Sequence, residues 1–228
     1  MTDFIYNGTT FKLSNRCKGW FSLPEKDVYE FIDTMNNDDI FYDLGACEGR
    51  FSVYSSRKNI KTYSFEPDCY NFNVLKENIQ INNLDGICNY FKNAISDVNK
   101  ELYLLKNQPW EGGHLKILEN GERVDKNESY KEKELVKAMR LDTIIEINNL
   151  PYPTHIKVDI DGNELNFIEG ARITLEKIKK IHIELTDDNK DIIINKFKDF
   201  NLKVECIYDV FSTRGKKYDG LYNYVFSK

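Results

Sequence analysis

Long apolar runs, paired cysteines and an excess of basic residues are all missing from this sequence of 228 residues. No segment approaches the roughly 18 consecutive apolar residues that span a bilayer, so we expect no membrane span. The five cysteines are odd in number and contain no CxxC pair, which favours reduced thiols in a cytoplasmic protein over disulfides or a zinc site. The net charge of −5 argues against nucleic acid as a partner, because basic residues supply most of that attraction.

What the chain does contain is enough apolar material for a core, with 41% hydrophobic and 13% aromatic residues. From residue 40 onward, short apolar runs alternate with amphipathic stretches. The runs that predict strands or further elements are "IFYDLG", "KTYSFEP", "ICNYFKNAIS", "ELYLLK", "HIKVDIDG" and "KKIHIEL". This alternation predicts an α/β fold with a mostly parallel sheet and helices on both faces. The last runs, "KVECIYDVF" and "LYNYVFSK", predict a C-terminal antiparallel hairpin.

Two segments stand apart from this alternation. Residues 1–38 predict an appendage made of a short hairpin, "FIYNGTTFKL", and a helix, "PEKDVYEFIDTM", ahead of a main domain over residues 39–228. Residues 119–140 are highly charged and nearly free of aromatic residues. We expect a solvated loop or surface helix there, and a flap over a substrate pocket is the alternative.

Polar side chains stand at the carboxyl ends of the predicted strands. They are Asp43, Glu66, Asn93, Asp159 and Glu184. In open α/β sheets, ligands bind beyond the carboxyl ends of the strands. We therefore expect these side chains to gather along one edge of the sheet, around a ligand.

The stretch "IFYDLGACEGRFS" places Asp43, Gly45 and Gly49 where a strand turns into a helix. Glycines there let the backbone approach a ligand and aim helix amides at it. The central glycine of the dinucleotide fingerprint G-x-G-x-x-G is missing, which disfavours a nucleotide-linked oxidoreductase. An acid before the turn suits an ammonium group, and Glu66 at the next strand end suits a ribose diol. S-adenosylmethionine combines both groups and has no phosphate.

Four blocks of the sequence resemble the FkbM-type methyltransferases of the class I, Rossmann-like fold. They are "FYDLGACEGRFS", "YSFEPDCYNFNVLKENIQIN", "NAISDVNKELYLL" and "LDTIIE…HIKVDIDGNELNFIEGARITLEKIKKIHIEL", and they cover about residues 38–186 in family order. The resemblance implies a seven-stranded sheet and S-adenosylmethionine as cofactor. The chain departs from the family at Asp161, where Glu is usual, and at Cys47-Glu48, where Asn and an apolar residue are common.

The resemblance also implies a set of cofactor-binding residues. Asp43, Gly45 and Gly49 would flank the methionine part, Glu66 would hold the ribose, and Asp159 would lie beside the transferred methyl group. Asn93 and Ala94 would lie against the adenine. The full set is Asp43, Gly45, Ala46, Gly49, Glu66, Pro67, Asn93, Ala94 and Asp159.

Methyl transfer to a hydroxyl benefits from a positioned base. The candidates for this catalytic role are Asp159, His114, Glu184 and Asp161. His114 lies in the glycine-containing loop "WEGGHLKI", and the alternatives for Asp161 are a helix cap or a metal ligand with Asp159 and Glu184. We do not expect a metal. His182 shares a strand face with Glu184, and we expect it to be a hydrogen-bonded structural residue.

The leading hypothesis is an O-methyltransferase that acts on a small molecule or a sugar or glycan precursor. Its sugar substrate is suggested by the family resemblance. A non-catalytic binding or scaffold protein that retains the fold is the alternative, kept open by the departures at Asp161 and Cys47-Glu48. Trp20 and Trp110 are candidates to stack on a sugar ring, although a core or rim position is preferred. The sequence leaves a homo-oligomer open.

Overall fold

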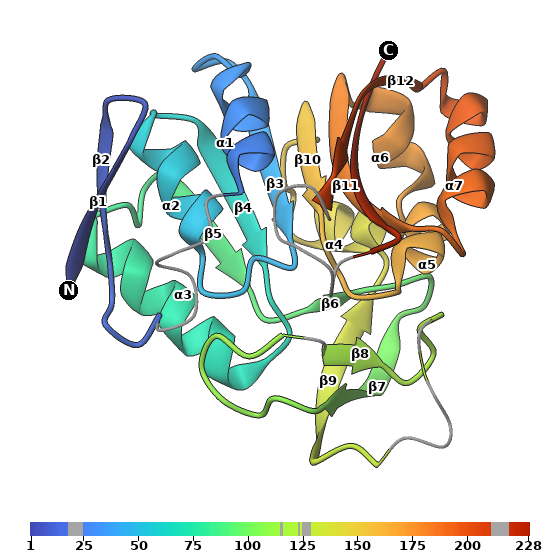
Figure 1. Cartoon of the computed structure of the whole chain (residues 1–228), viewed down its shortest axis with the longest axis horizontal. Helices are drawn as coiled ribbons and strands as arrows, with labels where there is room; N and C mark the ends of the chain where they lie inside the picture. The colour runs from blue at the N-terminus through green and yellow to red at the C-terminus, as the bar shows by residue number, and fades with distance from the viewer. Residues whose placement is uncertain (18–24, 115, 123, 125–128, 211–218) are drawn as a thin grey trace.

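The computed structural model describes residues 1–17, 25–114, 116–122, 124, 129–210 and 219–228 (Figure 1). A seven-stranded sheet runs through its centre in the order β12-β13-β11-β10-β3-β4-β5. Its strands are β3 Ile40–Leu44, β4 Lys61–Phe65, β5 Cys88–Phe91, β10 His155–Val158, β11 Lys180–Thr186, β12 Lys203–Asp209 and β13 Leu221–Ser227. The five strands from β11 to β5 pair in parallel, whereas β13 is antiparallel to both β11 and β12. The predicted class I sheet and its terminal hairpin are confirmed.

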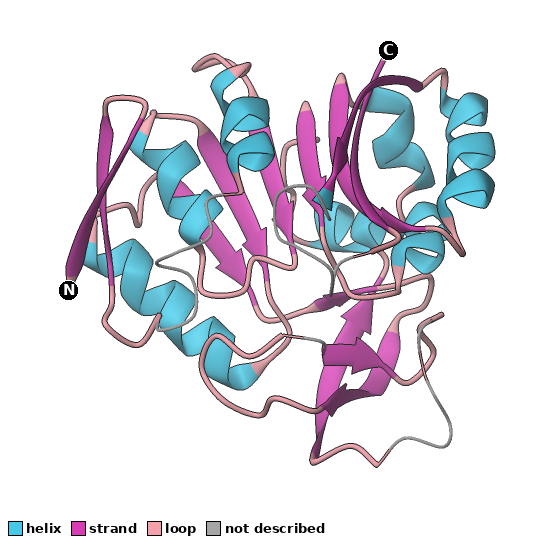
Figure 2. Cartoon of the chain, viewed as in Figure 1, coloured by secondary structure: helices cyan, strands magenta, loops and turns pink. Residues whose placement is uncertain are grey.

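Helices cover both faces of this sheet (Figure 2). They are α1 Lys26–Asp33, α2 Arg50–Arg57, α3 Cys69–Ile81, α4 Leu141–Ile147, α5 Glu164–Gly170, α6 Arg172–Lys177, α7 Lys190–Phe197 and the 3-10 helix η1 Lys198–Phe200. Alternation along β3 separates two cores, because Phe41 packs with residues of α1 to α3 and Tyr42 with residues of α4 to α7. The central strand β3 therefore buries both of its sides, as a doubly covered parallel sheet requires.

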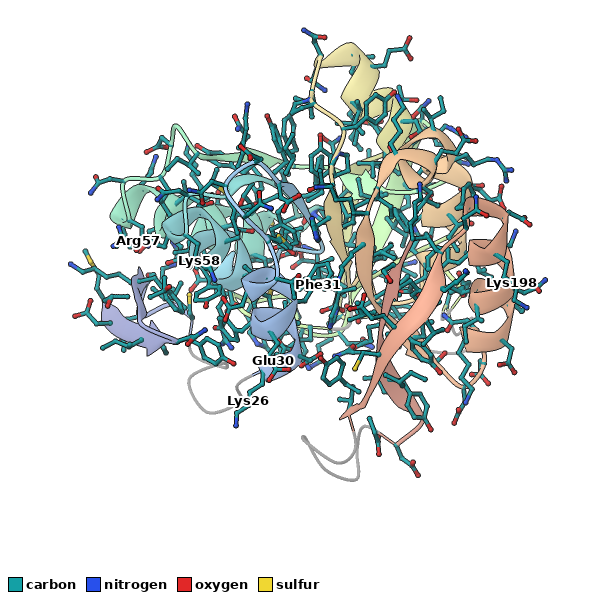
Figure 3. All side chains as sticks on the ribbon, turned by 90° about the horizontal axis from the view of Figure 1, so that it is seen from above. Lys26, Glu30, Phe31, Arg57, Lys58 and Lys198 are labelled. Atoms are coloured by element: carbon teal, nitrogen blue, oxygen red, sulfur yellow. The ribbon has the colours of Figure 1, made fainter. Side chains whose placement is uncertain are left out.

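The N-terminal segment packs onto the main domain. β1 Thr2–Tyr6 and β2 Thr9–Leu13 form the predicted hairpin around Asn7 and Gly8, which both have positive φ. Phe11 and Leu13 belong to the same core cluster as Phe41. Figure 3 shows α1 from above, with Phe31 on its inner side and Lys26 and Glu30 on its outer side.

A second, four-stranded sheet lies beside the carboxyl ends of the main strands (Figure 1). Its order is β6-β9-β7-β8, with β6 Ala94–Ile95, β7 Lys100–Lys106, β8 Lys116–Leu118 and β9 Glu132–Met139. The single strand predicted for "ICNYFKNAIS" is wrong, because its two halves belong to different sheets as β5 and β6. The expected loop or surface helix is also wrong over residues 132–139, since this segment is the strand β9, which pairs with β7 and at its end with β6.

In the part of the chain that the structure describes, none of the helices has the length and apolar composition of a membrane span.

Candidate active site

Two adjoining pockets open at the carboxyl ends of the central strands. The larger has about 690 Å³ of space that no atom fills, its open mouth included, and the smaller has about 370 Å³. Four residues line both of them, namely Gly45, Cys47, His114 and Asp159. The two pockets therefore form one continuous site with a boundary at these residues.

Most of the predicted site residues lie around the larger pocket. Its lining includes Gly45, Glu66, Pro67, Asn93, Ala94, His114, Asp159 and Asp161. Ala46 lines the smaller pocket. Asp43, Gly49 and Glu184 line neither of the two. Glu184 lies on β11 opposite Asn223, so its catalytic role stays a prediction without support from the pocket geometry.

Glu66 is held at the end of β4 by two backbone amides. The Cys47 N–H donates to Oε2 over 2.8 Å and the Asp68 N–H donates to Oε1 over 2.9 Å. The side chain is almost fully buried. Burial, only partly offset by the positive charge of Lys116, raises the pKa of Glu66 to about 7. The carboxyl group is thus fixed in position and titrates near neutrality.

Lys157 joins two of the predicted acids. Its Nζ lies 3.3 Å from Asp43 Oδ1 and 3.6 Å from Asp159 Oδ2, and it donates to the Gly45 carbonyl over 3.1 Å. Burial alone would lower the pKa of Lys157, but the two carboxylates outweigh that effect and raise it above its ordinary value. Asp43 is completely buried and its Oδ2 accepts a hydrogen bond from Ser52. Asp43 therefore does not face the pockets and contributes to the site indirectly, by holding Lys157 in place.

The two glycines of the first turn serve packing. Gly45 has φ +74°, and a Cβ there would lie 1.8 Å from the Asp159 carbonyl oxygen. Gly49 has φ +80°, and a Cβ there would lie 2.2 Å from Leu75 of α3. Gly45 thus lets β3 approach the β10 exit, and Gly49 lets α2 pack against α3.

The loop that carries His114 is fastened to α3 by one side chain. Asn71 accepts from the Gly112 N–H over 2.9 Å and donates to the Gly113 carbonyl over 3.2 Å. This two-sided contact holds His114 at the boundary between the pockets. Trp110, in the same loop, is 48% exposed and lines neither pocket. Trp20 lies outside the described residues.

The smaller pocket is rich in charge. Its lining includes Glu25, Glu48, Arg50, Lys157 and Asp159. Glu25 stands at the start of α1, and Arg50 at the start of α2. Groups of both signs in so small a space suit a zwitterionic or multiply polar ligand better than an apolar one.

Asp161 and His182 have contacts of their own. Asp161 has φ +52° and accepts a hydrogen bond from the Lys116 backbone N–H over 3.2 Å, so it ties β8 to the β10 exit. The N-cap position of α5 is occupied by Asn163, whose side chain makes no capping hydrogen bond, so Asp161 is not the N-cap residue. His182 is buried, and its Nε2 lies 3.0 Å from Asp27 Oδ2 on α1, in agreement with the structural role predicted for it.

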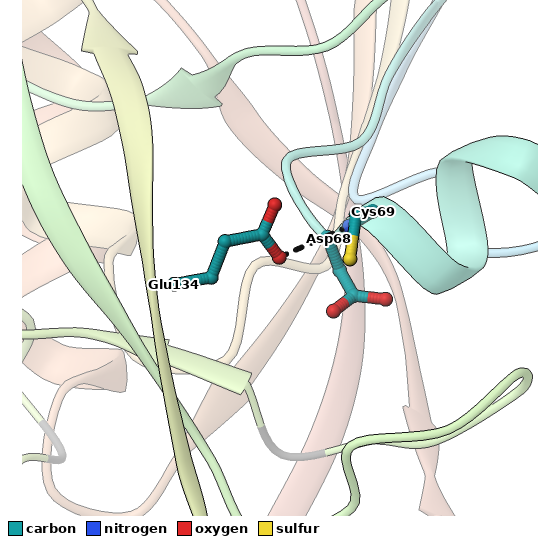
Figure 4. Close-up of side chains that lie close together, drawn as sticks. All are labelled: Asp68, Cys69 and Glu134. Atoms are coloured by element: carbon teal, nitrogen blue, oxygen red, sulfur yellow. Dashed lines mark hydrogen bonds between the residues drawn. The ribbon is translucent and has the colours of Figure 1, made fainter.

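The described residues contain one cluster with metal-ligand atoms in close range, namely Asp68, Cys69 and Glu134 (Figure 4). The Cys69 N–H donates to Glu134 there over 3.1 Å. A buried ammonium already holds this place, because Lys106 Nζ lies 2.8 Å from Asp68 Oδ2 and 2.6 Å from Glu134 Oε2. The cluster is therefore an ion-pair network. Asp159, Asp161 and Glu184 do not form such a cluster in the part of the chain that the structure describes.

Sequence reasoning missed this network and Lys157 as parts of the site. Asp68 also pairs with Lys116, whose Nζ lies 2.6 Å from Oδ1 and which lines the larger pocket. The signal was a lysine in each of two otherwise apolar strands, "HIKV" and "YLLK". A lysine at such a position needs a buried acid as partner.

Comparison with known proteins gives one curated relative and several structures of similar fold. The relative is the hexuronic acid methyltransferase AglP of Haloferax volcanii, 23% identical over 171 residues, which are 74% of this chain and 66% of that protein. The methyltransferase FkbM of Methylobacillus flagellatus KT superposes with a TM-score of 0.56 at 16% identity, over 85% of this chain and 44% of that one. TYW2 of M. jannaschii in complex with AdoMet superposes with a TM-score of 0.52 at 14% identity, over 100% of this chain and 86% of that one.

The chain thus spans 66% of the curated relative's length and less than half of the FkbM structure. The model of the methyltransferase FkbM domain matches residues 43–205. That range runs from the first strand of the main sheet to β12, and it contains every strand end around the larger pocket. The chain belongs to the FkbM methyltransferase domain family.

Proposed function

We propose that this protein is an S-adenosylmethionine-dependent methyltransferase that methylates a hydroxyl group of a small molecule or of a sugar or glycan precursor. The observation that carries the proposal is the convergence of Glu66, Asn93 and Asp159 on one pocket from three different strand ends. These residues are far apart in the sequence, and the parallel sheet alone brings them together.

The larger pocket fits the adenosine part of this cofactor. An apolar wall suits the adenine ring, and it consists of Phe65, Ala94, Ile95, Leu104 and Leu118. Glu66 suits a ribose diol, because a carboxylate fixed by two amides still has lone pairs for two hydroxyl donors.

When bound, S-adenosylmethionine supplies a methyl group activated by a sulfonium, which leaves as a neutral thioether. The protein's task is to hold the acceptor in line, which is worth up to about 7–11 kcal/mol, and to remove its proton. Asp159 and His114 are the candidates to accept the proton of the acceptor hydroxyl, since both lie at the boundary between the two pockets. Asp159 is partly exposed, and its Oδ2 lies 3.6 Å from Lys157 Nζ, so Lys157 helps to orient this carboxylate.

A sugar acceptor is supported by the relative from Haloferax volcanii, whose name states that it methylates a hexuronic acid. The polar lining of the site agrees with a polyol acceptor, because hydroxyl groups need hydrogen-bonding partners when they leave water.

The experiment is isothermal titration of the full chain with S-adenosylmethionine and S-adenosylhomocysteine. We expect saturable one-to-one binding of both compounds and no binding of NAD. Turnover is then measured by mass spectrometry, as the gain of one methyl group by neutral hexoses, hexuronic acids and their glycosides.

Asp159→Asn and His114→Gln separate the two candidate bases. We expect the variant that lacks the base to lose about 10²–10⁴-fold in kcat and to keep its affinity for S-adenosylhomocysteine. A folded protein that binds neither cofactor compound would refute the proposed function.

A further inference from the structure

Glu48 is a buried acid, and one of its two carboxyl oxygens has no hydrogen-bond donor in the part of the chain that the structure describes. It lines the smaller pocket and is only 4% exposed. Its Oε2 accepts a weak hydrogen bond from the Cys47 thiol over 3.3 Å. Its Oε1 is buried and has no hydrogen-bond partner among the described residues. A carboxyl oxygen in this condition costs free energy, so a missing donor is indicated.

The backbone around Glu48 holds the carboxyl group in place. Cys47 has φ +51°, and the Glu48 carbonyl accepts a hydrogen bond from Asn78 Nδ2 over 2.7 Å. On the other side, a Cβ on Gly112 would lie 2.4 Å from Glu48 Oε1. Gly112 has φ +70°, and the absence of a Cβ there lets the His114 loop lie close over the carboxyl group. The position of Glu48 is therefore built by the fold.

The electrostatics of this position favour a cationic ligand. Burial raises the pKa of Glu48 above its ordinary value, and the neighbouring charge of Arg50 offsets this only in part. A positively charged donor that reached Oε1 would stabilise the carboxylate and give the buried oxygen its partner.

Asp43 is badly placed for the same task, although its position in the sequence suggested it. It is completely buried, Ser52 donates to its Oδ2, and Lys157 faces its Oδ1. It lines neither of the two pockets. A ligand would have to displace Lys157 to reach it.

We infer that Glu48 is the counter-ion of the ammonium group at the amino-acid end of the cofactor. The inference rests on the proposed function. If Glu66 holds the ribose in the larger pocket, the amino-acid end extends across Gly45 and Cys47, which line both pockets, into the smaller one. There Glu48 accepts from the ammonium, while Arg50 supplies positive charge for the carboxylate.

The test is a cycle of one substitution and one chemical change in the ligand. Affinities of the wild type and of Glu48→Gln are measured for S-adenosylhomocysteine and for its desamino analogue, which lacks only the amino group. For the wild type we expect loss of the amino group to weaken binding about ten- to a hundredfold, as for a charge-assisted hydrogen bond. For Glu48→Gln we expect the two ligands to bind with similar affinity.

Glu146→Gln is the matched control, because it removes the same charge from an exposed residue of α4. It should keep the full discrimination between the two ligands. The Glu48→Gln variant should fold, since a neutral amide of the same shape avoids the cost of burying a charge. Its unfolding midpoint, measured without ligand, checks this.

Two results would overturn the inference. One is a wild type that binds the desamino analogue as tightly as S-adenosylhomocysteine, a measurement that needs no variant. The other is an equal loss on removal of the amino group in the wild type and in Glu48→Gln. Both leave the proposed function standing, whereas a wild type that binds neither compound would refute the proposed function itself.

Discussion

Replacing Lys106 by methionine should remove a buried ion pair that joins the small sheet to Asp68 of the main domain. Lys106 is 0% exposed, and its ammonium contacts Asp68, Glu132 and Glu134 at 2.8, 2.8 and 2.6 Å. Methionine matches the aliphatic part of the lysine side chain up to Cε and lacks only the ammonium group. The substitution therefore isolates the charge and its hydrogen bonds.

The expected loss of stability depends on the partners that the buried carboxylates keep without Lys106. Asp68 is fully buried and keeps Lys116 as a partner, whereas Glu134 keeps the Cys69 N–H and the partly exposed Lys92. Removing one partner of a buried ion pair typically costs about 3–5 kcal/mol. For a chain of this size, about 2–4 °C of melting temperature accompany each kcal/mol. We expect Lys106→Met to unfold roughly 6–20 °C below the wild type.

The same substitution should change how stability depends on pH. Burial alone would raise the pKa of Glu134, but hydrogen bonds from Lys106, Lys92 and the Cys69 amide outweigh it and lower the pKa to about 2. A carboxyl group with a lowered folded-state pKa stabilises the fold above its unfolded value, and this is lost as pH falls from about 4.5 to about 2. A lowering of this size is worth about 3 kcal/mol, and Lys106 supplies part of it.

The assay is urea unfolding followed by circular dichroism, at neutral pH and at several acidic pH values, for the wild type, Lys106→Met and Lys137→Met. Lys137 lies on the exposed side of β9, the strand that carries Glu132 and Glu134, so its replacement should change stability by less than about 0.5 kcal/mol. The reasoning is refuted if Lys106→Met is as stable as the wild type at neutral pH. An unchanged acid slope in that variant would refute the pH argument alone.

Three further predictions concern the main domain and the pocket. Gly45→Ala should lower the free energy of unfolding by about 2–5 kcal/mol in thermal unfolding, because its Cβ would lie 1.8 Å from the Asp159 carbonyl oxygen at a positive φ. The control is Gly86→Ala, which has open space around it and should leave stability unchanged or slightly raised. Burial lowers the pKa of His155 to about 4, so the wild type should lose stability as pH falls from about 6.5 to about 4, and His155→Gln should lose less over that range. Since burial raises the pKa of Glu66 to about 7, the affinity for S-adenosylmethionine measured by calorimetry should fall as pH drops through that value. Glu66→Gln should bind S-adenosylmethionine weakly, with an affinity that does not depend on pH. A wild type whose affinity is the same on both sides of pH 7 would contradict this.

The strand ends around the pocket were accessible to sequence reasoning because the signal is local. An apolar run that stops at Glu66, Asn93 or Asp159 marks both the strand and its exit. The rule that parallel strands share an edge then places these exits together, as the structure shows. Their roles toward a ligand stay predictions.

The strand β9 was missed because the side of it that faces the domain carries charge. Glu132 and Glu134 point inward to Lys106, while Lys133 and Leu135 face outward. An apolar stripe with a period of two, the usual mark of a half-buried strand, is therefore absent from its first half. The buried acids make sense only with a lysine on another strand, and local sequence carries no information about that partner.

Lys157 lies in the last block of the family resemblance, yet its partner could not be read from that block. In the parallel pairing of β10 with β3, Lys157 stands directly opposite Asp43. Two opposite charges in two otherwise apolar strands are a sign of such a pair, because neither is tolerated alone in a core. The register that joins them depends on the tertiary fold.

The alternation along β9 has a consequence for how this segment can diverge among relatives. Positions 132, 134, 136 and 138 face the ion-pair network and the small apolar cluster, whereas 131, 133, 135 and 137 are exposed. Mutational drift should therefore be concentrated at every second residue, so that the outer face can acquire new recognition properties without disturbing the ion-pair network or the small apolar cluster.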